Sequence, residues 1–397
     1  MKDSDICAKL GPPSKDRPRI VIFADSPLPS LKDGPLGRGG GQAATWLSQV
    51  AEEFGKAADL EIIWIELRPK TRASGLEHRG SQTFIHLGHP RQSWDLALGF
   101  HLVRWRLRRL LRMLRPGVVH CWGTERLHAA ATEVAPCPVI LSMQGILSEY
   151  QRIGGMHDVW QWRALANNEP RWVKAATEIT CESQWGLEQL RRLGRHERMR
   201  QIEYGVHPSF YELKWQPDPQ DPFLLFSGSV DWRKGVDVLA EAAAMAADRK
   251  WRLEIAGDGP LKASLEARNL PNVKCLGNLD WPTLQDRLTK AWGFILPTRA
   301  DTSPNSVKEA RVVGLPVVTT PSGGQSGYII DGQNGFLVDP LDAPGLLAAC
   351  DKVTASLDTA ITMGRARHQQ DRDYFRPQNT ASSFLLLYRE LSGANPA

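Results

Sequence analysis

The chain has 397 residues, more than one hydrophobic core usually serves, so two domains are expected. Its hydrophobic fraction of 42% and charged fraction of 23% are those of an ordinary globular protein. The net charge of +5 suits an anionic ligand or an anionic surface, and it does not call for nucleic acid as a partner.

The cysteines and the apolar runs indicate a cytoplasmic protein. The six cysteines are scattered, with no Cys-x-x-Cys pair, which argues for reduced thiols and against a disulfide or zinc framework. No apolar run approaches the roughly 18 residues that span a bilayer. Residues 1–18 lack the apolar core of a signal peptide, and we expect them to be a flexible lead-in.

Short β-rich runs bounded by glycine or proline recur along the chain, with helical stretches between them. A first block of expected strands covers residues 19–24, 60–66, 83–87, 117–121, 138–143 and 178–181. A second block covers residues 223–227, 252–256, 272–276, 293–297, 316–320 and 335–338. Strand–helix alternation in two blocks predicts an α/β protein with two doubly wound, Rossmann-like domains.

The domain boundary is expected at the polar, proline-rich stretch 211–222. We therefore predict an N-terminal domain at residues 19–210 and a C-terminal domain at residues 211–378. The last segment, residues 379–397, contains a helix that is expected to pack back toward the N-terminal domain.

Residues 101–115 predict an amphipathic helix with a basic face. Its apolar face carries Val103, Leu107, Leu110 and Leu114. Its basic face carries Arg104, Arg108, Arg112 and Arg115. One interpretation is a helix that packs on the sheet and leaves its arginines in water; the other adds peripheral contact with an anionic membrane through residues 104–115.

Two cations stand where an expected strand gives way to a helix, in the stretch Phe-Ser-Gly-Ser-Val-Asp-Trp-Arg-Lys-Gly at residues 226–235. Arg233 and Lys234 would lie at the carboxyl edge of a sheet, where cations can stabilise a diphosphate leaving group. The alternative is a surface turn with solvated charges.

Two glycine-rich stretches and two strand ends are further candidates. Ala-Gly-Asp-Gly-Pro at residues 256–260 lacks the third glycine of a dinucleotide fingerprint, so a tight turn is an equal alternative. Gly40 and Gly41 would let backbone approach an anion, with a flexible loop as the alternative. His120 and Gln144 close two strands; such residues are commonly satisfied polar groups, and here they would face a ligand.

The stretch Thr-Arg-Ala-Asp-Thr-Ser-Pro-Asn-Ser-Val-Lys-Glu at residues 298–309 places two acids around a helix start. Ser303 is expected as the N-cap, with Pro304 in the first turn and Gly314 as the stop. The free N–H groups of this start favour phosphate. Glu309 could accept hydrogen bonds from ribose hydroxyls, and Asp301 would lie over the mouth of the site. The alternative is an acid that only satisfies the helix dipole.

In this order and spacing, the motifs resemble the retaining, nucleotide-sugar-dependent glycosyltransferases of family four, which have the GT-B fold. The resemblance is most specific over residues 226–340 and looser in the N-terminal half. It implies two Rossmann-like domains facing a cleft, with the donor nucleotide on the C-terminal domain and the acceptor on the N-terminal one. It also implies that no metal or cofactor is needed, because basic side chains and helix-start amides hold the diphosphate.

The resemblance assigns catalytic roles to Lys234, Arg233, Asp301, Glu309 and His120. Lys234 would bind the donor phosphates and Glu309 the ribose. Asp301, the first acid of the E-x7-E motif, would face the transferred sugar, and His120 would contact sugar as well. The residues expected around the donor are Gly40, Gly41, Gln144, Gly228, Ser229, Gly257, Gly277, Ser303, Asn305 and Ser306.

The sequence departs from the family pattern at four positions. Asp301 replaces a glutamate, Ser229 replaces a phosphate-binding arginine, and Gly327 replaces a glutamate. Gln144 stands where many members carry a histidine. A glutamine can hydrogen-bond a sugar hydroxyl but cannot act as a base at neutral pH. This agrees with a retaining mechanism in which the donor's own phosphate oxygen takes the acceptor proton.

The expected activity is transfer of a sugar from a nucleotide-diphosphate sugar to an acceptor hydroxyl in glycan, surface polysaccharide or glycolipid biosynthesis. A GT-B sugar-nucleotide epimerase is one alternative. A non-catalytic sugar-nucleotide-binding subunit is the other, suggested by Asp301, Ser229 and Gln144. A nicotinamide dehydrogenase is disfavoured, because no complete glycine fingerprint follows a strand.

Overall fold

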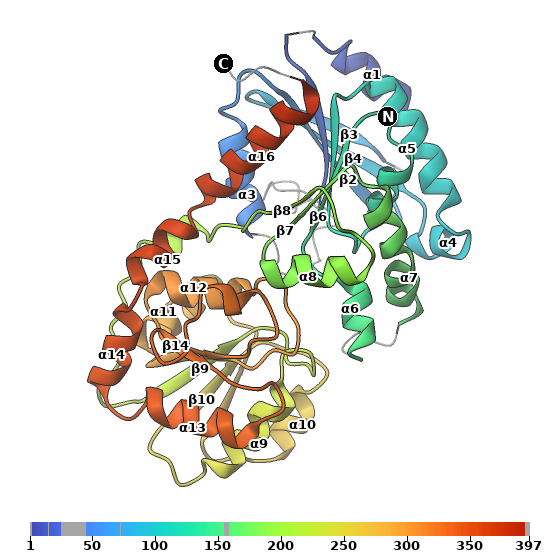
Figure 1. Ribbon diagram of the computed structural model, residues 1–397. Coiled ribbons are helices and arrows are strands. Elements are labelled where there is room, and N and C mark those ends of the chain that lie inside the picture. The colour runs from blue at the N-terminus through green and yellow to red at the C-terminus, as the bar shows by residue number, and fades with distance from the viewer. Residues whose placement is uncertain (1, 15, 25–44, 72, 155–158, 394–397) are drawn as a thin grey trace. The chain divides into compact units, whose positions relative to one another are not determined.

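The computed structural model describes residues 2–14, 16–24, 45–71, 73–154 and 159–393. The chain divides into two compact units, each built on its own sheet (Figure 1). The first unit comprises Met1–Glu182, Leu187–Tyr204 and Pro377–Ala397. The second unit comprises Ser183–Gly186 and Gly205–Arg376.

The sheet of the first unit has eight strands in the order β3-β4-β2-β1-β5-β6-β7-β8. The strands are β1 (Arg19–Phe23), β2 (Glu61–Pro69), β3 (Gly75–Arg79), β4 (Gln82–His89), β5 (Val118–Trp122), β6 (Val139–Met143), β7 (Glu178–Cys181) and β8 (Met199–Gln201). Neighbouring strands are parallel except for β3, which pairs antiparallel with β4. The six strands expected in this half of the chain are confirmed.

The two edge strands of this sheet were not predicted from the sequence. β3 is a polar segment whose residues are half-buried or exposed, and Gly80 (φ 56°) turns the chain back into β4. β8 spans three residues and is largely exposed. Edge strands need only one covered side, so neither carries the apolar run by which buried strands are recognised.

Helices pack on both faces of the first sheet. They are α1 (Asp3–Leu10), α3 (Thr45–Phe54), α4 (Gln92–Ala97), α5 (His101–Leu114), α6 (Leu147–Arg152), α7 (Trp160–Ala175), α8 (Gln184–Arg192) and α16 (Pro377–Ser392), with the 3₁₀ helix η1 (Leu127–Glu133). Alternate side chains of a strand point to opposite faces. Val21 and Phe23 of β1 accordingly join the core of α5, and Ile20 and Ile22 join the core of α3 and α16. α16 lies beside α3 (Figure 1).

The sheet of the second unit has six parallel strands in the order β11-β10-β9-β12-β13-β14. They are β9 (Phe223–Ser227), β10 (Arg252–Ala256), β11 (Val273–Gly277), β12 (Gly293–Leu296), β13 (Val317–Thr319) and β14 (Gly335–Leu337). All six were expected. Counted within the unit, the order is 3-2-1-4-5-6, that of a Rossmann sheet. The order reverses between β9 and β12, so the loops leaving these two strands start at the switch point.

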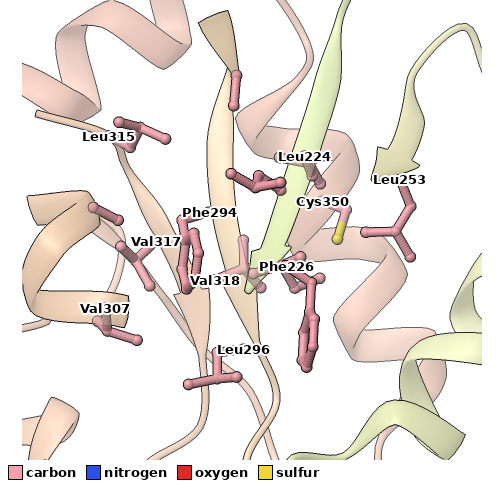
Figure 2. Close-up of a cluster of buried hydrophobic side chains, with 14 of the residues drawn as sticks. Leu224, Phe226, Leu253, Phe294, Leu296, Val307, Leu315, Val317, Val318 and Cys350 are labelled. Atoms are coloured by element: carbon pink, nitrogen blue, oxygen red, sulfur yellow. The ribbon is translucent and has the colours of Figure 1, made fainter. Parts of the chain in front are cut away.

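Helices cover both faces of the second sheet as well (Figure 1). They are α9 (Val236–Met245), α10 (Lys262–Ala267), α11 (Trp281–Lys290), α12 (Asn305–Val313), α13 (Ala343–Val353), α14 (Leu357–Arg365) and α15 (His368–Tyr374), with the 3₁₀ helices η2 (Pro208–Phe210) and η3 (Gly324–Gly327). α9 packs beside α13, and α11 beside α12. Figure 2 shows Phe226 of β9, Phe294 of β12 and Val307 of α12 in the apolar core that joins helices to sheet.

The stretch 211–222 was expected as a linker, and this expectation is wrong. The indole N–H of Trp215 donates to the carbonyl of Ala291 at 2.8 Å, and the backbone N–H of Gln216 donates to Thr289 at 2.8 Å. These bonds fasten the stretch to the second unit, which begins at Gly205. Proline and charge made the segment resemble a linker, but backbone hydrogen bonds decide whether a polar segment packs.

None of the described helices combines the length and the apolar composition that crossing a membrane requires.

A buried ion pair joins α12 to α15 inside the second unit. Arg311 Nε lies 2.7 Å from Asp371 Oδ2, and both side chains are almost completely buried. Arg311 also donates to the carbonyls of Leu315 and Ala366, each at 2.6 Å. Burial raises the pKa of the Asp371 carboxyl, although the Arg311 charge opposes the shift. Because the guanidinium is held by several acceptors, this pair fixes α15 against the helix that carries Glu309.

Removing the carboxylate of this pair should strongly destabilise the fold. Asp371→Ala leaves the buried Arg311 charge unpaired, which costs about 3–5 kcal/mol in the free energy of unfolding. The matched control is Asp373→Ala on the same helix, whose pair with Arg376 is exposed and contributes below about 1 kcal/mol. Urea unfolding of both variants measures the difference, and equal losses would contradict the assignment.

Candidate active site

The candidate site lies at the carboxyl edge of the second sheet, where the loops after β9 and β12 leave the switch point. In open α/β sheets ligands bind outside the carboxyl ends of the strands at this place. The β9 loop leads into α9 and carries Arg233 and Lys234, and the β12 loop leads into α12 and carries Asp301. The topology therefore brings Asp301 to Arg233 and Lys234, from which the sequence separates it by more than sixty positions.

A glycine allows the two loops to approach each other closely. Gly235 ends the β9 loop in the left-handed region at φ 74° and precedes α9. A Cβ atom at this position would lie 1.9 Å from the carbonyl oxygen of Pro297 in the β12 loop. The backbone N–H of Lys234 donates to Asp231 Oδ1 at 2.8 Å, which closes the turn. Any other residue than glycine would push the loops apart.

Arg299 fastens the same two loops, and the sequence analysis did not identify it. Its guanidinium donates to both carboxylate oxygens of Asp237 at 2.7 Å and lies 4.2 Å from the ring centroid of Trp232. Its backbone N–H donates to the carbonyl of Arg233 at 2.8 Å. Arg299 is therefore a positioning residue for Arg233. The available signal was a cation two residues before Asp301, in a loop already marked as functional.

Asp301 forms ion pairs with both Lys234 and Arg233. Lys234 Nζ lies 2.5 Å from Asp301 Oδ2, and Arg233 NH1 lies 3.4 Å from the same oxygen. Burial alone would raise the pKa of the Asp301 carboxyl, but the charges of Lys234 and Arg233 outweigh it and lower the pKa. The backbone carbonyl of Asp301 accepts from the N–H of Gly324 at 3.0 Å. The carboxylate is thus ionised and cation-bound, and it does not cap α12.

The start of α12 differs from the sequence prediction by one residue. Pro304 is the N-cap and supplies no side-chain hydrogen bond, so Ser303 is not the expected cap. Proline is favoured at the start of a helix, because the N–H that it lacks would have no intrahelical partner there. Asn305 is exposed and Ser306 half-buried. Within the described ranges, no acceptor takes a hydrogen bond from the backbone N–H of Asn305 or Ser306. These two N–H groups belong to the first turn of α12, where the helix itself offers them no partner.

Glu309 lies on the second turn of α12 and is half-buried. Loss of solvation raises the pKa of its carboxyl from an ordinary 4.5 to about 7, and the neighbouring Lys308 charge only partly opposes this. Near pH 7 the group is therefore divided between its acid and its carboxylate. The same helix thus follows an ionised Asp301 and carries an acid that titrates near neutrality.

The glycines expected around the donor form a hydrogen-bonded set of turns. Gly228 (φ 155°) donates its N–H to Ala256, and Gly257 (φ 144°) donates to Gly277 (φ 65°) at 2.8 Å. A Cβ atom at Gly257 would lie 1.9 Å from the carbonyl oxygen of Gly228. Packing of adjacent turns accounts for these glycines without a ligand. Contact of this set, or of half-buried Ser229, with a donor stays a prediction.

The structure corrects the expectation for His120. Its ring nitrogens are hydrogen-bonded to Tyr388 Oη at 2.7 Å and to Ser142 Oγ at 2.6 Å, and the side chain is fully buried in the first unit. Burial lowers the pKa of the imidazole to about 3, so it stays neutral. His120 is a satisfied core residue. Gln144 is half-buried at the end of β6, while Gly40 and Gly41 lie outside the described residues.

Glu125 is a second residue that the sequence analysis missed. It follows β5 at the carboxyl edge of the first sheet, and its carboxylate lies against two glycines. A Cβ atom at Gly123 would lie within van der Waals overlap of Glu125 Oε2, and one at Gly145 would lie 3.0 Å from Oε1. The signal was an acid two residues after a strand-ending glycine, in a stretch already selected for His120.

Metal-binding groups do not gather in this part of the molecule. Over the described residues, histidine, cysteine, aspartate and glutamate form no cluster of three that could hold a metal ion. The positive charge of the site comes from Lys234, Arg233 and the start of α12.

Comparison with known proteins supports the same region. Residues 221–356 match the family model of glycosyl transferases group 1. Glycogen synthase of Mycobacterium tuberculosis is 26% identical over 76% of each chain. A GDP-mannose-dependent alpha-mannosyltransferase of Corynebacterium glutamicum is 23% identical over 60% of this chain and 59% of its own.

Solved structures share the architecture. Sucrose-phosphate synthase of Thermosynechococcus elongatus superposes with a TM-score of 0.75 at 18% identity, covering 96% of this chain and 100% of that one. Anabaena HepE, solved with UDP-glucose, gives a TM-score of 0.69 at 16% identity over 94% of this chain and 100% of its own. At these identities the likeness establishes the fold.

Together, the fold, the matched region and the named relatives define the class: the chain is a glycosyltransferase with the GT-B fold. More particularly, residues 221–356 are its glycosyl transferases group 1 domain. The resemblance seen in the motifs is thereby confirmed for the GT-B fold and the glycosyltransferase class.

The close approach at Gly235 makes a testable prediction. Gly235→Ala combines a left-handed φ, which costs about 1–2 kcal/mol for a non-glycine residue, with a clash against Pro297. The matched control is Gly332→Ala, which has the same left-handed strain (φ 72°) and open space around it. Thermal unfolding should show a clearly larger drop for Gly235→Ala. Equal drops would mean that the contact between the loops does not constrain the site.

Proposed function

We propose that this glycosyltransferase moves a sugar from a nucleoside diphosphate sugar to an acceptor hydroxyl and retains the anomeric configuration. The observation that carries the proposal is the convergence of Lys234 and Arg233 on Asp301 at the switch point, in front of an α12 start without a side-chain cap. Two cations and free amides at one sheet edge suit a ligand with two phosphates.

Leaving-group stabilisation is the task of this arrangement. As the bond from the anomeric carbon to the diphosphate breaks, negative charge grows on the phosphate oxygens. Lys234, Arg233 and the amides of Asn305 and Ser306 are fixed donors that need little reorganisation to meet that charge. Because the chain itself supplies this charge, the proposal requires no metal ion and no cofactor.

The transfer of the acceptor proton can be accounted for in a reaction that retains the anomeric configuration. The acceptor oxygen forms its bond to the anomeric carbon while the bond to the phosphate oxygen breaks. The acceptor proton passes to that phosphate oxygen, so no protein base is needed. This agrees with Gln144, which cannot act as a base, and with His120, whose buried imidazole has no free nitrogen.

Relatives support a nucleoside diphosphate sugar as the donor without selecting its base. Anabaena HepE was solved with UDP-glucose, and the Corynebacterium relative is named for GDP-mannose. We propose the part common to both names. Glu309, on the second turn of α12, would accept hydrogen bonds from the ribose hydroxyls, and Asp301 would face the transferred sugar.

We propose a carbohydrate or lipid-linked acceptor and a cytoplasmic location, with a role in glycan, surface polysaccharide or glycolipid synthesis. The named relatives include a glycogen synthase and a Vi polysaccharide biosynthesis protein of Salmonella typhi, which supports a saccharide acceptor. Six free cysteines support a reducing compartment. Glu125, at the carboxyl edge of the first sheet, is the side chain we propose for acceptor hydroxyls.

Loss of one phosphate-binding cation should remove turnover and leave the fold intact. Lys234→Ala is expected to lower kcat by about 10²–10³, the range seen when one preorganised donor is removed. The donor is first chosen by thermal shift with UDP-glucose and GDP-mannose, because a bound donor raises the melting temperature. Lys250→Ala, an exposed lysine of the same unit, is the matched control and should keep full activity.

Product analysis separates the alternatives in the same experiment. Full activity of Lys234→Ala would contradict the role of Lys234 in binding the donor phosphates. A new nucleotide-sugar isomer formed without acceptor would identify an epimerase. A thermal shift without hydrolysis, isomerisation or transfer to any acceptor mixture would identify a non-catalytic binding subunit.

Glu309 predicts a pH dependence of donor binding. Ribose hydroxyls donate to the carboxylate, and a pKa of about 7 leaves most of the group protonated at pH 6 and most of it ionised at pH 8. Donor affinity should therefore rise with pH, by up to about tenfold over this range. Calorimetric titration with the chosen nucleotide sugar measures it, and Glu309→Gln should lose the slope. An unchanged slope in that variant would rule out Glu309 as its source.

The same pKa predicts the effect of Glu309→Gln on stability. A folded-state pKa above the ordinary value means that ionisation opposes folding, fully above pH 7 and not at all below about pH 4.5. Glu309→Gln should therefore raise the free energy of unfolding at pH 8, by at most about 3 kcal/mol, and change it little at pH 4.5. Urea unfolding at the two pH values tests this, and a loss of stability at pH 8 would contradict it.

A further inference from the structure

The outer surface of α4 and α5 exposes large apolar side chains that the core does not use. Trp94 is 63% exposed and Trp105 is 65% exposed, and Leu98 and Leu102 are exposed beside them in the sequence. Monomeric proteins seldom gather such side chains on one surface without a partner. We call residues 94, 98, 102, 105, 108, 109 and 112 the α4–α5 patch.

Helical geometry places the α5 part of this patch opposite the core. The buried stripe of α5 comprises Val103, Leu107, Leu110, Leu111 and Leu114. At 100° per residue, Trp105 falls near the middle of the opposite face, with Arg108, Arg109 and Arg112 around it. The aromatic ring is therefore the centre of the outward ridge, and the guanidinium groups surround it.

The arginines of α5 divide into two groups, which the sequence could not distinguish. Arg104 Nε donates to Glu133 Oε2 at 2.6 Å, and Arg106 NH2 donates to Asp3 Oδ1 at 2.7 Å, so both are held by the first unit. Arg108, Arg109 and Arg112 are exposed, and among the described residues no ion pair engages them. Of the basic face expected at residues 104–115, Arg104 is thereby excluded, while Arg108 and Arg112 remain available. Arg115, just beyond α5, is exposed as well.

Within residues 91–115, no exposed acid offsets their charge. α5 contains no aspartate or glutamate, and the one acid of residues 91–115 is Asp95. Asp95 is buried, where its carboxylate lies 2.7 Å from His89 Nε2 and accepts from the N–H of Val103 at 3.1 Å. It therefore caps α5 from within and does not reach the patch. The Arg109 guanidinium lies 6.0 Å from the ring centroid of Trp105 and extends the cationic surface over it.

We propose that the α4–α5 patch docks on the surface of a bilayer that contains anionic lipids. Trp94, Leu98 and Trp105 enter the boundary between headgroups and acyl chains, where tryptophan is favoured. Arg108, Arg109 and Arg112 stay at the level of the lipid phosphates, with their alkyl stems along the apolar layer.

Charge complementarity favours a bilayer over other occupants. A bilayer offers negative charge and an apolar layer within the length of one arginine side chain. Nucleic acid would match the charge, but the aliphatic Leu98 and Leu102 offer no face for a base to stack on. Arginine and tryptophan also occur at protein–protein interfaces, but three like charges around the central ring would repel the same patch of a second copy of this chain. The proposal concerns a different surface from the donor site, so either can fail without the other.

The test is co-sedimentation of the full chain with vesicles of phosphatidylcholine, with and without about one third phosphatidylglycerol. Binding is expected for the anionic vesicles at low salt and should weaken as salt screens the charges. The triple variant Arg108→Gln, Arg109→Gln, Arg112→Gln should lose at least about tenfold in partitioning, since each basic residue contributes several-fold. Trp94→Ala with Trp105→Ala should also lose binding, at an unchanged melting temperature.

Matched controls remove charge and aromatic surface elsewhere. Arg191→Gln, Arg268→Gln, Arg365→Gln removes three exposed arginines outside the patch, and Trp160→Ala removes another exposed tryptophan. Both controls should bind like the unmodified chain. Absence of binding to anionic vesicles, or equal losses in patch and control variants, would overturn the proposal.

Two further outcomes would assign the patch to another occupant and also overturn the proposal. One is a concentration-dependent dimer in analytical ultracentrifugation that the Trp105→Ala change abolishes. The other is a single-stranded oligonucleotide that binds as tightly as the anionic vesicles and depends on the same three arginines.

Discussion

One carboxylate holds the two loops of the candidate site together. Asp301 takes Lys234 and Arg233 as partners, and without it two cations would face each other in a half-buried place. The approach of the two loops at Gly235 makes the contact geometrically available. In the proposed function, a diphosphate would compete with this carboxylate for the same cations. Two cations against one carboxylate leave a net charge of +1 at this place, so Asp301 offsets only part of the positive charge.

The two acids of the E-x7-E segment are driven in opposite directions by their surroundings. Cations keep Asp301 ionised in spite of burial, whereas desolvation leaves Glu309 poised near pH 7. Seven residues, which include one helix start, separate them. Such a split assigns different work to chemically similar groups. The shorter side chain at Asp301 still reaches Lys234, at 2.5 Å.

The sequence predicted the parts that repeat a strong local pattern. Twelve strands were found because most parallel strands read as apolar runs, and the motif loops were found because glycine and charge mark strand ends. Contacts made through space were not predictable in the same way. Nothing local distinguishes His120, held by Tyr388, from a ligand-facing histidine, or Arg106, held by Asp3, from Arg108 in water. The prediction of a linker at residues 211–222 was wrong for the same reason.

The return of α16 to the first unit sets an order of events during synthesis. Phe384 and Tyr388 complete the core around His120, and Tyr388 supplies one of its two hydrogen bonds. The ribosome delivers these residues only after the whole second unit has emerged. The core of the first unit therefore stays incomplete until α16 has been synthesised. By then all strands of the second unit have been synthesised, because that unit is contiguous from Gly205 to Arg376 apart from one short segment. The N-terminal half is made first but is finished last.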